Sequence, residues 1–501
     1  MSRLVNFTDI AEEARLAALS LADYASDMVD PTVRLGVTGL SRAGKTVFIT
    51  SLVHNLTRGG RLPLFSAQAS GRIASATLSP QPDDAVPRFE YETHLSALTG
   101  GGKPDTRHWP DSTRHISELR VTLNFESETF LGRNLGRGRL NLDIVDYPGE
   151  WLLDLSLLDL DYAQWSAKAI AQSRNPARAK LAEPFHAVLK TLDPNADEDE
   201  TKAREAAATF TDYLRAAREE RYALSALPPG RFLMPGDLEG SPALTFAPLD
   251  IKPDARARRG RLHAMMERRY EAYRATVVRP FFRDHFARLD RQIVLVDLLQ
   301  ALNAGPSAVS DLETALADIL SAFRPGRNSW LSRILARRVD RIVFAATKAD
   351  HLHHTNHDRL EALLGHIAGR AIKQADFAGA ATDVVALASV RATREATVTR
   401  GGEALDCIVG VPEKGQKVGG DTYDGKTEVA LFPGDLPEDP RTVLADPEHA
   451  LTAPEGVSEA EWEAFRFLRF RPPLLDQAPN AILPHIRLDR VLEFLLSDRL
   501  L

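Results

Sequence analysis

A short stretch near the N-terminus has the residue types and spacing of a phosphate-binding loop. Residues 39–46 read Gly-Leu-Ser-Arg-Ala-Gly-Lys-Thr and fit the pattern G-x-x-x-x-G-K-[ST]. In such a loop the backbone N–H groups surround the phosphate oxygens, the lysine reaches the β and γ oxygens, and the hydroxyl holds Mg²⁺. We therefore expect a nucleotide to be bound through the following residues: Gly39, Ser41, Arg42, Ala43, Gly44, Lys45, Thr46 and Val47.

A second motif, Asp-Tyr-Pro-Gly-Glu at residues 146–150, supplies groups for the other side of a triphosphate. Asp146 would hold Mg²⁺ through water, and Gly149 would let a backbone N–H approach the γ-phosphate. Glu150 stands where small switch GTPases carry a glutamine that orients the attacking water, so its negative charge predicts slow turnover. Asp297 is a rival metal-side acid because it follows four apolar residues, but no glycine follows it. We expect Asp146 to be the acid on the metal side and Asp297 to be a strand-end residue near the site.

The sequence Thr-Lys-Ala-Asp at residues 347–350 has the form of a guanine-reading motif. The Asp350 carboxylate can accept hydrogen bonds from N1–H and the 2-amino group of guanine, whereas adenine has a donor in neither position. Lys348 would lie over the base. A loop after the next strand would contact the guanine O6 through a backbone N–H. The expected nucleotides are therefore GTP and GDP, and the expected base-side residues are Thr347, Lys348, Asp350, Ser389 and Val390.

Four histidines near this motif raise the question of a metal centre: His351, His353, His354 and His357. The surrounding sequence offers no carboxylate or cysteine in ligand spacing other than Asp350, so we do not expect these histidines to bind a metal. The single cysteine, Cys407, also excludes an internal disulfide and a zinc site built on four cysteines.

Strands must position these motifs, because each motif follows an apolar segment. An apolar strand at residues 33–37 precedes the phosphate loop, and residues 46–56 continue with a helical apolar period. Residues 119–125 and 140–146 alternate as the two strands of an antiparallel hairpin. Further strands are expected at residues 293–297, 341–347 and 383–388. The predicted fold class is α/β, a P-loop NTPase of the GTPase type with a mixed sheet flanked by helices.

The length of 501 residues exceeds that of one ordinary domain, so we expect one core with insertions. Residues 57–112, rich in Gly, Pro, Ser and Asp, are expected to form a long mobile connection. The predicted units are an N-terminal helix, the core, a large helical insertion, and a small strand-rich C-terminal extension with a closing helix; they occupy residues 1–30, 31–150 with 291–400, 151–290 and 401–501.

The composition is that of a globular protein that works away from nucleic acid. Hydrophobic residues make up 44% of the chain and charged residues 26%, which allows a sizeable core. The formal net charge of −7 argues against nucleic acid as a general partner. The N-terminus lacks the apolar segment of a signal peptide, and no stretch approaches roughly 18 uninterrupted apolar residues, so we expect a cytoplasmic protein.

The order of the motifs resembles that of the translation-factor-like class of P-loop GTPases. The stretches Gly-Leu-Ser-Arg-Ala-Gly-Lys-Thr, Asp-Tyr-Pro-Gly-Glu-Trp and Ala-Thr-Lys-Ala-Asp-His-Leu are similar to those of the YcjX family of predicted GTPases. The resemblance implies a stress-associated bacterial protein with an unknown protein partner, for which a membrane protein is a candidate, and a peripheral place at the inner membrane. It also implies a catalytic switch threonine that would meet Mg²⁺, for which Thr113 and its neighbour Ser112 are the two candidates.

The leading functional hypothesis is a Mg²⁺-dependent, GTP-hydrolysing switch that is slow without a partner. Self-association in a homodimer is one route to faster turnover, with Arg42 supplying positive charge. An ATP-driven enzyme is a second hypothesis, which requires the guanine-reading motif to be accidental. A third is a scaffold that keeps nucleotide for stability and binds a partner through the helical insertion.

Overall fold

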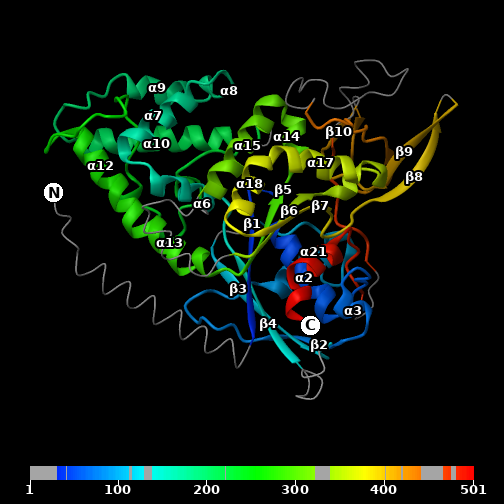
Figure 1. The fold of residues 1–501 in the computed structure, drawn as a ribbon. Helices are drawn as coiled ribbons and strands as arrows, with labels where there is room; N and C mark the ends of the chain where they lie inside the picture. Colours follow the sequence, from blue (N-terminus) through cyan, green and yellow to red (C-terminus); the bar gives the residue numbers. More distant parts are fainter. Residues whose placement is uncertain are drawn as a thin grey trace.

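The protein is a mixed α/β structure in which helices cover both faces of one large sheet (Figure 1). The computed structural model describes residues 31–40, 42–111, 115–128, 138–219, 222–321, 339–400, 402–418, 421–441, 467–475 and 481–501. The helix expected at residues 1–30 lies outside the described residues, as do Ser41, Ser112 and Thr113. Within the described residues, no helix is both long and apolar enough to cross a membrane.

The central sheet has the strand order β2-β3-β4-β1-β5-β6-β7. Neighbours from β4 to β7 are parallel, whereas β2, β3 and β4 pair antiparallel. The bounds are β1 Thr32–Gly39, β2 Ile73–Ser79, β3 Ser117–Phe125, β4 Gly138–Asp146, β5 Arg291–Val296, β6 Arg341–Thr347 and β7 Ala381–Leu387. The expected hairpin is confirmed as β3 and β4, and the other expected strands are confirmed as β1, β5, β6 and β7.

Strand β5 lies inside the sheet and is buried on both faces, which explains its continuous apolar sequence. Ile293 and Leu295 belong to the hydrophobic cluster formed with α2 (Lys45–Thr57) and α21 (Leu488–Leu496). Val294 and Val296 belong to the cluster on the opposite face. The helices of that face are α15 (Pro306–Ser321), α17 (His357–Ile367) and α18 (Gly369–Phe377), with α14 (Leu298–Ala304) directly after β5.

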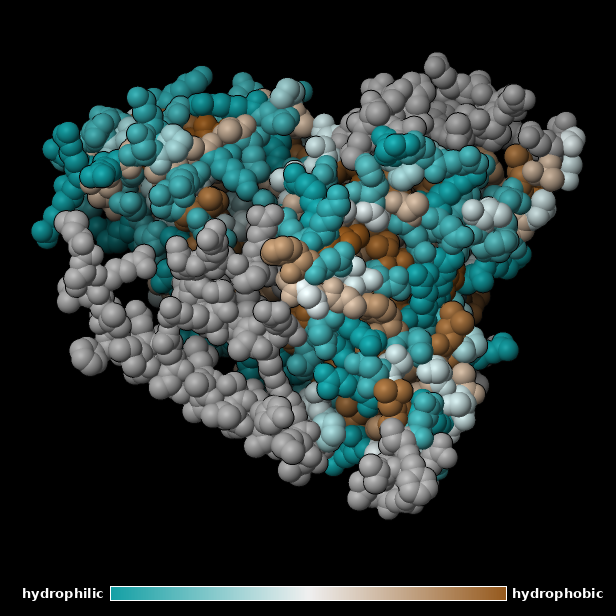
Figure 2. Space-filling model, viewed as in Figure 1, coloured by the Kyte–Doolittle hydropathy of each residue, from teal (hydrophilic) through white to brown (hydrophobic). Residues whose placement is uncertain are grey.

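Between β4 and β5 the chain forms a helical unit, at the upper left of Figure 1. Its centre is aromatic: Trp165 stacks on Tyr270 with ring centroids 5.1 Å apart. Its apolar residues are continuous with one face of the sheet, and its visible outer surface is mostly hydrophilic (Figure 2). Its helices are α6 Glu150–Leu153, α7 Tyr162–Ser173, α8 Pro176–Ala179, α9 Glu183–Leu189, α10 Glu200–Ala217, α11 Gly230–Leu233, α12 Leu262–Tyr273 and α13 Arg279–Asp284, and a π-helical turn, Arg274–Val278, joins the last two.

The segment at residues 57–112, expected to be a long mobile connection, contains regular secondary structure. This segment contains α3 (Ser66–Ala69), strand β2 and α4 (Tyr91–Thr99). Strand β2 is the edge of the sheet and pairs only with β3, so it stays partly exposed and needs no alternating apolar pattern. Its sequence, Ile-Ala-Ser-Ala-Thr-Leu-Ser, is accordingly too polar to be recognised as a strand.

After β7 the chain leaves the central sheet before it returns to it. A separate three-stranded sheet follows in the order β12-β9-β8, with β8 Arg394–Arg400, β9 Glu403–Gly410 and β12 Val429–Leu431; a short pair, β10 Lys417–Val418 and β11 Asp421–Thr422, lies between. Residues 467–475, called the strap below, then cross towards the loops of the central sheet. Helix α21 closes the chain, with Leu488, Val491 and Leu492 buried against the sheet.

Candidate functional site

The phosphate loop connects the end of β1 to the start of α2. Gly44 has a φ of 84°, a left-handed conformation that favours glycine, directly before the helix. Gly39 has no room for a side chain, because a Cβ there would lie 2.7 Å from a carbonyl oxygen of β5. The Lys45 ammonium donates to the Gly39 carbonyl at 3.1 Å, so it folds back over the loop. The Thr46 hydroxyl donates to the Asp111 carbonyl at 3.4 Å.

The motif at residues 146–150 packs against this loop. Asp146 ends β4 beside Val37 of β1, and it is buried at the edge where the parallel strands end. Gly149 touches the loop backbone, because a Cβ at this position would lie 1.7 Å from the Gly39 carbonyl oxygen. Any larger residue would therefore force the motif and the loop apart.

Glu150 is buried, and a residue of the helical unit holds its carboxylate. Its Oε1 lies 2.7 Å from a guanidinium nitrogen of Arg218, which directly follows α10. The pair balances the negative charge that Glu150 would otherwise bring to the site. Sequence reasoning missed Arg218, because it lies in an Ala- and Arg-rich helical run that carries no motif.

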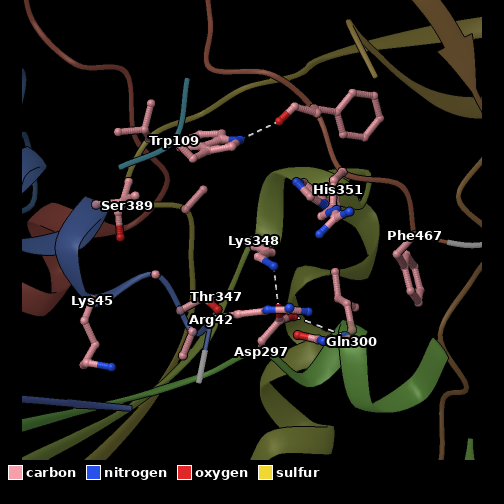
Figure 3. A pocket seen from close by; sticks show the side chains of 18 of the residues that line it. Arg42, Lys45, Trp109, Asp297, Gln300, Thr347, Lys348, His351, Ser389 and Phe467 are labelled. Carbon is pink, nitrogen blue, oxygen red and sulfur yellow. Dashed lines mark hydrogen bonds and ion pairs between the residues drawn. The ribbon is translucent and has the colours of Figure 1, made fainter. Parts of the chain in front are cut away.

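The base-reading motif directly follows β6. The Asp350 carboxylate is buried and accepts a hydrogen bond from the Ala392 N–H at 2.7 Å. Burial raises the pKa of Asp350 to about 6, although its hydrogen bonds act in the opposite direction. Lys348 has a left-handed backbone, with φ of 62°, and its ammonium pairs with Asp297 (Figure 3). Asp297, expected near the site, is thus the direct partner of the motif's lysine.

The loop after β7 is fixed through its backbone. The Ser51 hydroxyl, on α2, donates to the Ser389 carbonyl at 2.5 Å. Ala388 exchanges two backbone hydrogen bonds with Ile486, just before α21. The helix that follows the phosphate loop and the loop that contains Val390 are therefore tied together.

These segments enclose a cavity of about 330 Å³, a volume that suits a small-molecule ligand. Phosphate-side and base-side residues selected from the sequence meet in its lining: Arg42, Ala43, Gly44, Lys45, Thr46, Val47, Glu150, Thr347, Lys348, Asp350, Ser389 and Val390. Of the selected residues that the structure describes, Gly39, Asp146 and Gly149 do not line the cavity. Ser41 and Thr113 fall in segments that are not described.

The strap and Trp109 form another wall of the cavity, and sequence reasoning missed both. The Trp109 indole N–H donates to the Phe470 carbonyl at 2.6 Å (Figure 3), and the Asn303 side chain donates to the Phe467 carbonyl at 3.1 Å. The His351 ring lies edge-on to Phe470, with centroids 5.2 Å apart. Burial lowers the pKa of His351 to about 3, so the ring is neutral. No local pattern marks these residues, because they reach the cavity only through tertiary packing.

The phosphate end of the site has the chemistry of a polyphosphate and Mg²⁺ site. The Thr46 hydroxyl and the Asp146 carboxylate are hard oxygen donors of the kind that Mg²⁺ prefers. Lys45 and Arg42 add positive charge to the lining of the cavity. The donor set therefore fits Mg²⁺ bound together with phosphate oxygens.

Known proteins resemble this chain over nearly its whole length. A family model described as the YcjX-like family, DUF463, matches residues 33–500. A protein named Ras-like GTPase YcjX from Escherichia coli (strain K12) is 38% identical over 484 residues, which cover 94% of this chain and 97% of that protein. A protein of the same name from Shewanella oneidensis (strain MR-1) is 34% identical over 493 residues, with 94% of this chain and 95% of that protein covered.

Proposed function

This chain belongs to the YcjX-like family, and from that premise we propose that it binds GTP and GDP with Mg²⁺ and hydrolyses GTP as a switch. The relatives' name, Ras-like GTPase, supports both the nucleotide and the reaction. The observation that carries the proposal is that distant segments of the chain line one cavity and supply a phosphate end and a base end. The same arrangement supports assignment of the α/β core to the P-loop GTPase type.

At the phosphate end, the Lys45 ammonium would leave the Gly39 carbonyl and donate to the β and γ oxygens instead. This change of acceptor requires only rotation of the flexible lysine side chain. The backbone N–H groups at the start of α2 add partial positive charge. Thr46 would hold Mg²⁺ directly and Asp146 through water, with Thr113 as the expected switch ligand. The bound metal would neutralise charge that develops on the β and γ oxygens.

At the base end, the Ala392 N–H holds the Asp350 carboxylate in place for the two guanine donors. Adenine offers no donor at these positions, so the same carboxylate would disfavour ATP. Lys348 would lie over the base and Ser389 with Val390 at its O6 edge. The cavity provides space beside these residues, since all of them line it.

At the γ-phosphate, Gly149 would offer its backbone N–H and Glu150 would face the attacking water. A glutamate lacks the amide N–H₂ of glutamine and brings negative charge, so turnover well below ~1 s⁻¹ is expected for the isolated protein. The contact with Arg218 supports a role for the helical unit in hydrolysis, because the guanidinium offsets the negative charge of Glu150.

The helical unit is positioned to respond to the nucleotide, because its later part packs on its own first segment, residues 150–154, directly after the γ-phosphate glycine. A Cβ at Gly230 would lie 1.8 Å from the Glu150 carbonyl oxygen. The Trp151 indole N–H donates to the Met234 carbonyl at 3.0 Å. Asp154 accepts hydrogen bonds from the Gly230 N–H at 2.6 Å and the Tyr273 hydroxyl at 2.5 Å. Any displacement of this segment by a γ-phosphate would have to move these contacts, which makes the helical unit the proposed output of the switch.

The proposed division of the chain is a core at residues 31–150 and 291–400, a helical insertion at 151–290 and a C-terminal extension at 401–501. A role in bacterial stress, a membrane protein as partner, a peripheral place at the inner membrane and a homodimer stay predictions. The insertion is the candidate partner surface, because its inner side contacts the switch segment.

The test is a nucleotide titration with a fluorescent GDP analogue, followed by phosphate release with and without Mg²⁺. GTP and GDP should displace the probe, ATP should need at least a hundredfold higher concentration, and chelation of Mg²⁺ should stop phosphate release. Displacement by ATP as effective as by GTP would point to an ATP-driven enzyme. Tight GTP binding without phosphate release under any condition would favour the scaffold hypothesis.

A further inference from the structure

Two histidines behind the base-reading motif lie against the hairpin formed by β8 and β9. The Nδ1 atom of His354 is 2.9 Å from the Oε2 atom of Glu395 on β8. The Nε2 atom of His353 is 3.9 Å from the same oxygen. The ligand atoms of these three residues all lie within 4.8 Å of one another. Two imidazole nitrogens and one carboxylate oxygen therefore lie close together.

These separations are close to those around a bound metal ion. A tetrahedral Zn²⁺ ion with bonds of about 2.0–2.1 Å places its ligand atoms about 3.3 Å apart. The distances of 2.9 and 3.9 Å lie on either side of that value. The His354 side chain is 64% exposed, whereas the His353 side chain is 9% exposed. A small rotation of the exposed ring would complete the geometry.

The second ring nitrogen of His353 has the partners expected for a metal ligand. Its Nδ1 atom lies 3.0 Å from the Thr355 hydroxyl oxygen and 3.4 Å from a carboxylate oxygen of Asp406 on β9. Metal-binding histidines usually donate this second N–H to a carboxylate or another oxygen, which fixes the tautomer. With the proton on Nδ1, the lone pair of Nε2 is directed to the side of Glu395.

The Glu395 carboxylate offers one of its two oxygens to the histidines. Its other oxygen, Oε1, lies 3.5 Å from the Arg391 guanidinium, which leaves Oε2 for the two histidines.

We propose that His353, His354 and Glu395 bind a divalent late first-row metal ion, best fitted by Zn²⁺, and that Asp406 orients His353. Two imidazoles and one carboxylate are a common zinc ligand set, with a fourth position for water. Mg²⁺ prefers oxygen ligands throughout, so this site is chemically distinct from the one at the phosphate end.

The sequence offers these histidines no carboxylate in ligand spacing other than Asp350, and the carboxylate of this cluster comes from a distant part of the chain. Glu395 is 41 residues beyond His354 in the chain, and the fold alone brings the two together. The other two histidines of the group have different contacts: His351 packs on the strap, and His357 bonds to the Ala349 carbonyl at 2.9 Å.

A metal at this site would cross-link the loop after Asp350 to the β8–β9 hairpin. The residues just before β8 already hold Asp350, since Ala392 donates to its carboxylate and Thr393 to its carbonyl. The ion would therefore strengthen an attachment that positions the base-reading carboxylate. Because only the folded chain brings the ligands together, binding should also raise the thermal transition.

The test uses the full-length, nucleotide-free protein, stripped of metal with a chelator and titrated with ZnCl₂ in a buffer that contains excess Mg²⁺. One Zn²⁺ per chain is expected, together with a higher thermal transition temperature. His354→Ala and Glu395→Gln should each lower the affinity at least tenfold, and Asp406→Asn about tenfold as the loss of an orienting group. His366→Ala, which removes an exposed histidine of α17, is the matched control and should bind as the wild type does.

X-ray absorption at the zinc edge would show two imidazole nitrogens among the ligands. The proposal is overturned if no stoichiometric binding occurs below about 10 μM Zn²⁺, or if the affinity is equal in the wild type and in Glu395→Gln, which keeps the side-chain shape. A spectrum without imidazole would overturn it as well. Since nucleotide is absent throughout, failure of the proposed GTP hydrolysis leaves these results unaffected.

Discussion

Arg218 and Glu150 form a 2.7 Å ion pair that joins the helical insertion to the residue after the γ-phosphate glycine. Both side chains line the cavity beside Arg42 and Lys45. The Glu150 side chain is only 7% exposed, so its charge is compensated mainly by Arg218 rather than by water. A γ-phosphate that enters the cavity would compete with this carboxylate for the guanidinium. The ion pair thus links the lining of the cavity to the helical insertion.

Arg218→Ala should lower the single-turnover rate of GTP hydrolysis by about tenfold or more and should also weaken GTP binding, because an uncompensated carboxylate would remain at the γ-phosphate. Adding Glu150→Gln in the same chain should recover most of that loss. Arg215→Ala is the control, since Arg215 is exposed on the last turn of α10, close to Arg218, and pairs with Asp212. A wild-type rate in Arg218→Ala would remove this residue from the mechanism.

Asp350→Asn should weaken GTP binding by about 2–4 kcal/mol, because two hydrogen bonds to a charged acceptor are lost. The same variant should bind xanthosine triphosphate better than the wild type does. Competitive titrations measure both affinities. Asp358→Asn changes an exposed carboxylate close in sequence and should leave both affinities as they are. Unchanged GTP affinity in Asp350→Asn would refute the base-reading role.

GTP affinity should fall with pH below about 6. The guanine donors need an ionised carboxylate, and burial raises the pKa of Asp350 to about 6, so its protonated fraction grows below that value. The expected loss is about tenfold per pH unit well below the pKa, with a plateau above pH ~7. His351, whose pKa burial lowers to about 3, does not titrate in this range. The same titration with Asp350→Asn corrects for protonation of the nucleotide phosphates and should lack the component due to Asp350.

Lys45→Ala and Thr46→Ala should each abolish Mg²⁺-dependent hydrolysis, since one removes charge from the β and γ oxygens and the other a metal ligand. Phosphate release under saturating GTP is the measurement. Lys103→Ala, at an exposed lysine, is the control and should keep the wild-type rate. Full turnover by purified Lys45→Ala would place the reaction elsewhere in the molecule.

Gly149→Ala should lower the free energy of unfolding by about 1–3 kcal/mol, because the new methyl group would overlap the Gly39 carbonyl. Gly369→Ala is the matched control: its Cβ would meet nothing within 4 Å, at the first residue of α18. That variant should be as stable as the wild type or slightly more stable. Chemical denaturation compares the three chains, and equal loss in both variants would mean that the contact between the motif and the loop contributes nothing.

The parts of the site that follow a strand could be predicted from the sequence, because phosphate and guanine chemistry restricts the residues directly after β1, β4 and β6 to short motifs. Arg218, Trp109 and the strap could not be predicted, since their place depends on the packing of segments far apart in the chain. The edge strand β2 was hidden because it buries little apolar surface. The cluster of His353 and His354 could not be predicted for the same reason. Its carboxylates, Glu395 and Asp406, lie on β8 and β9, far from the histidines in the sequence.

The core of the protein can be completed only after helix α21 has been synthesised. The apolar side of α21 covers part of one face of the central sheet through Leu488, Val491, Leu492 and Leu495. All strands of this sheet have been synthesised once β7 ends at Leu387. A ribosome that adds about 5–20 residues per second needs on the order of 10 s to travel from that strand to α21. Throughout this interval the part of the face that α21 covers stays open to chaperones. A message truncated before α21 would therefore yield a chain with every nucleotide motif and no finished core.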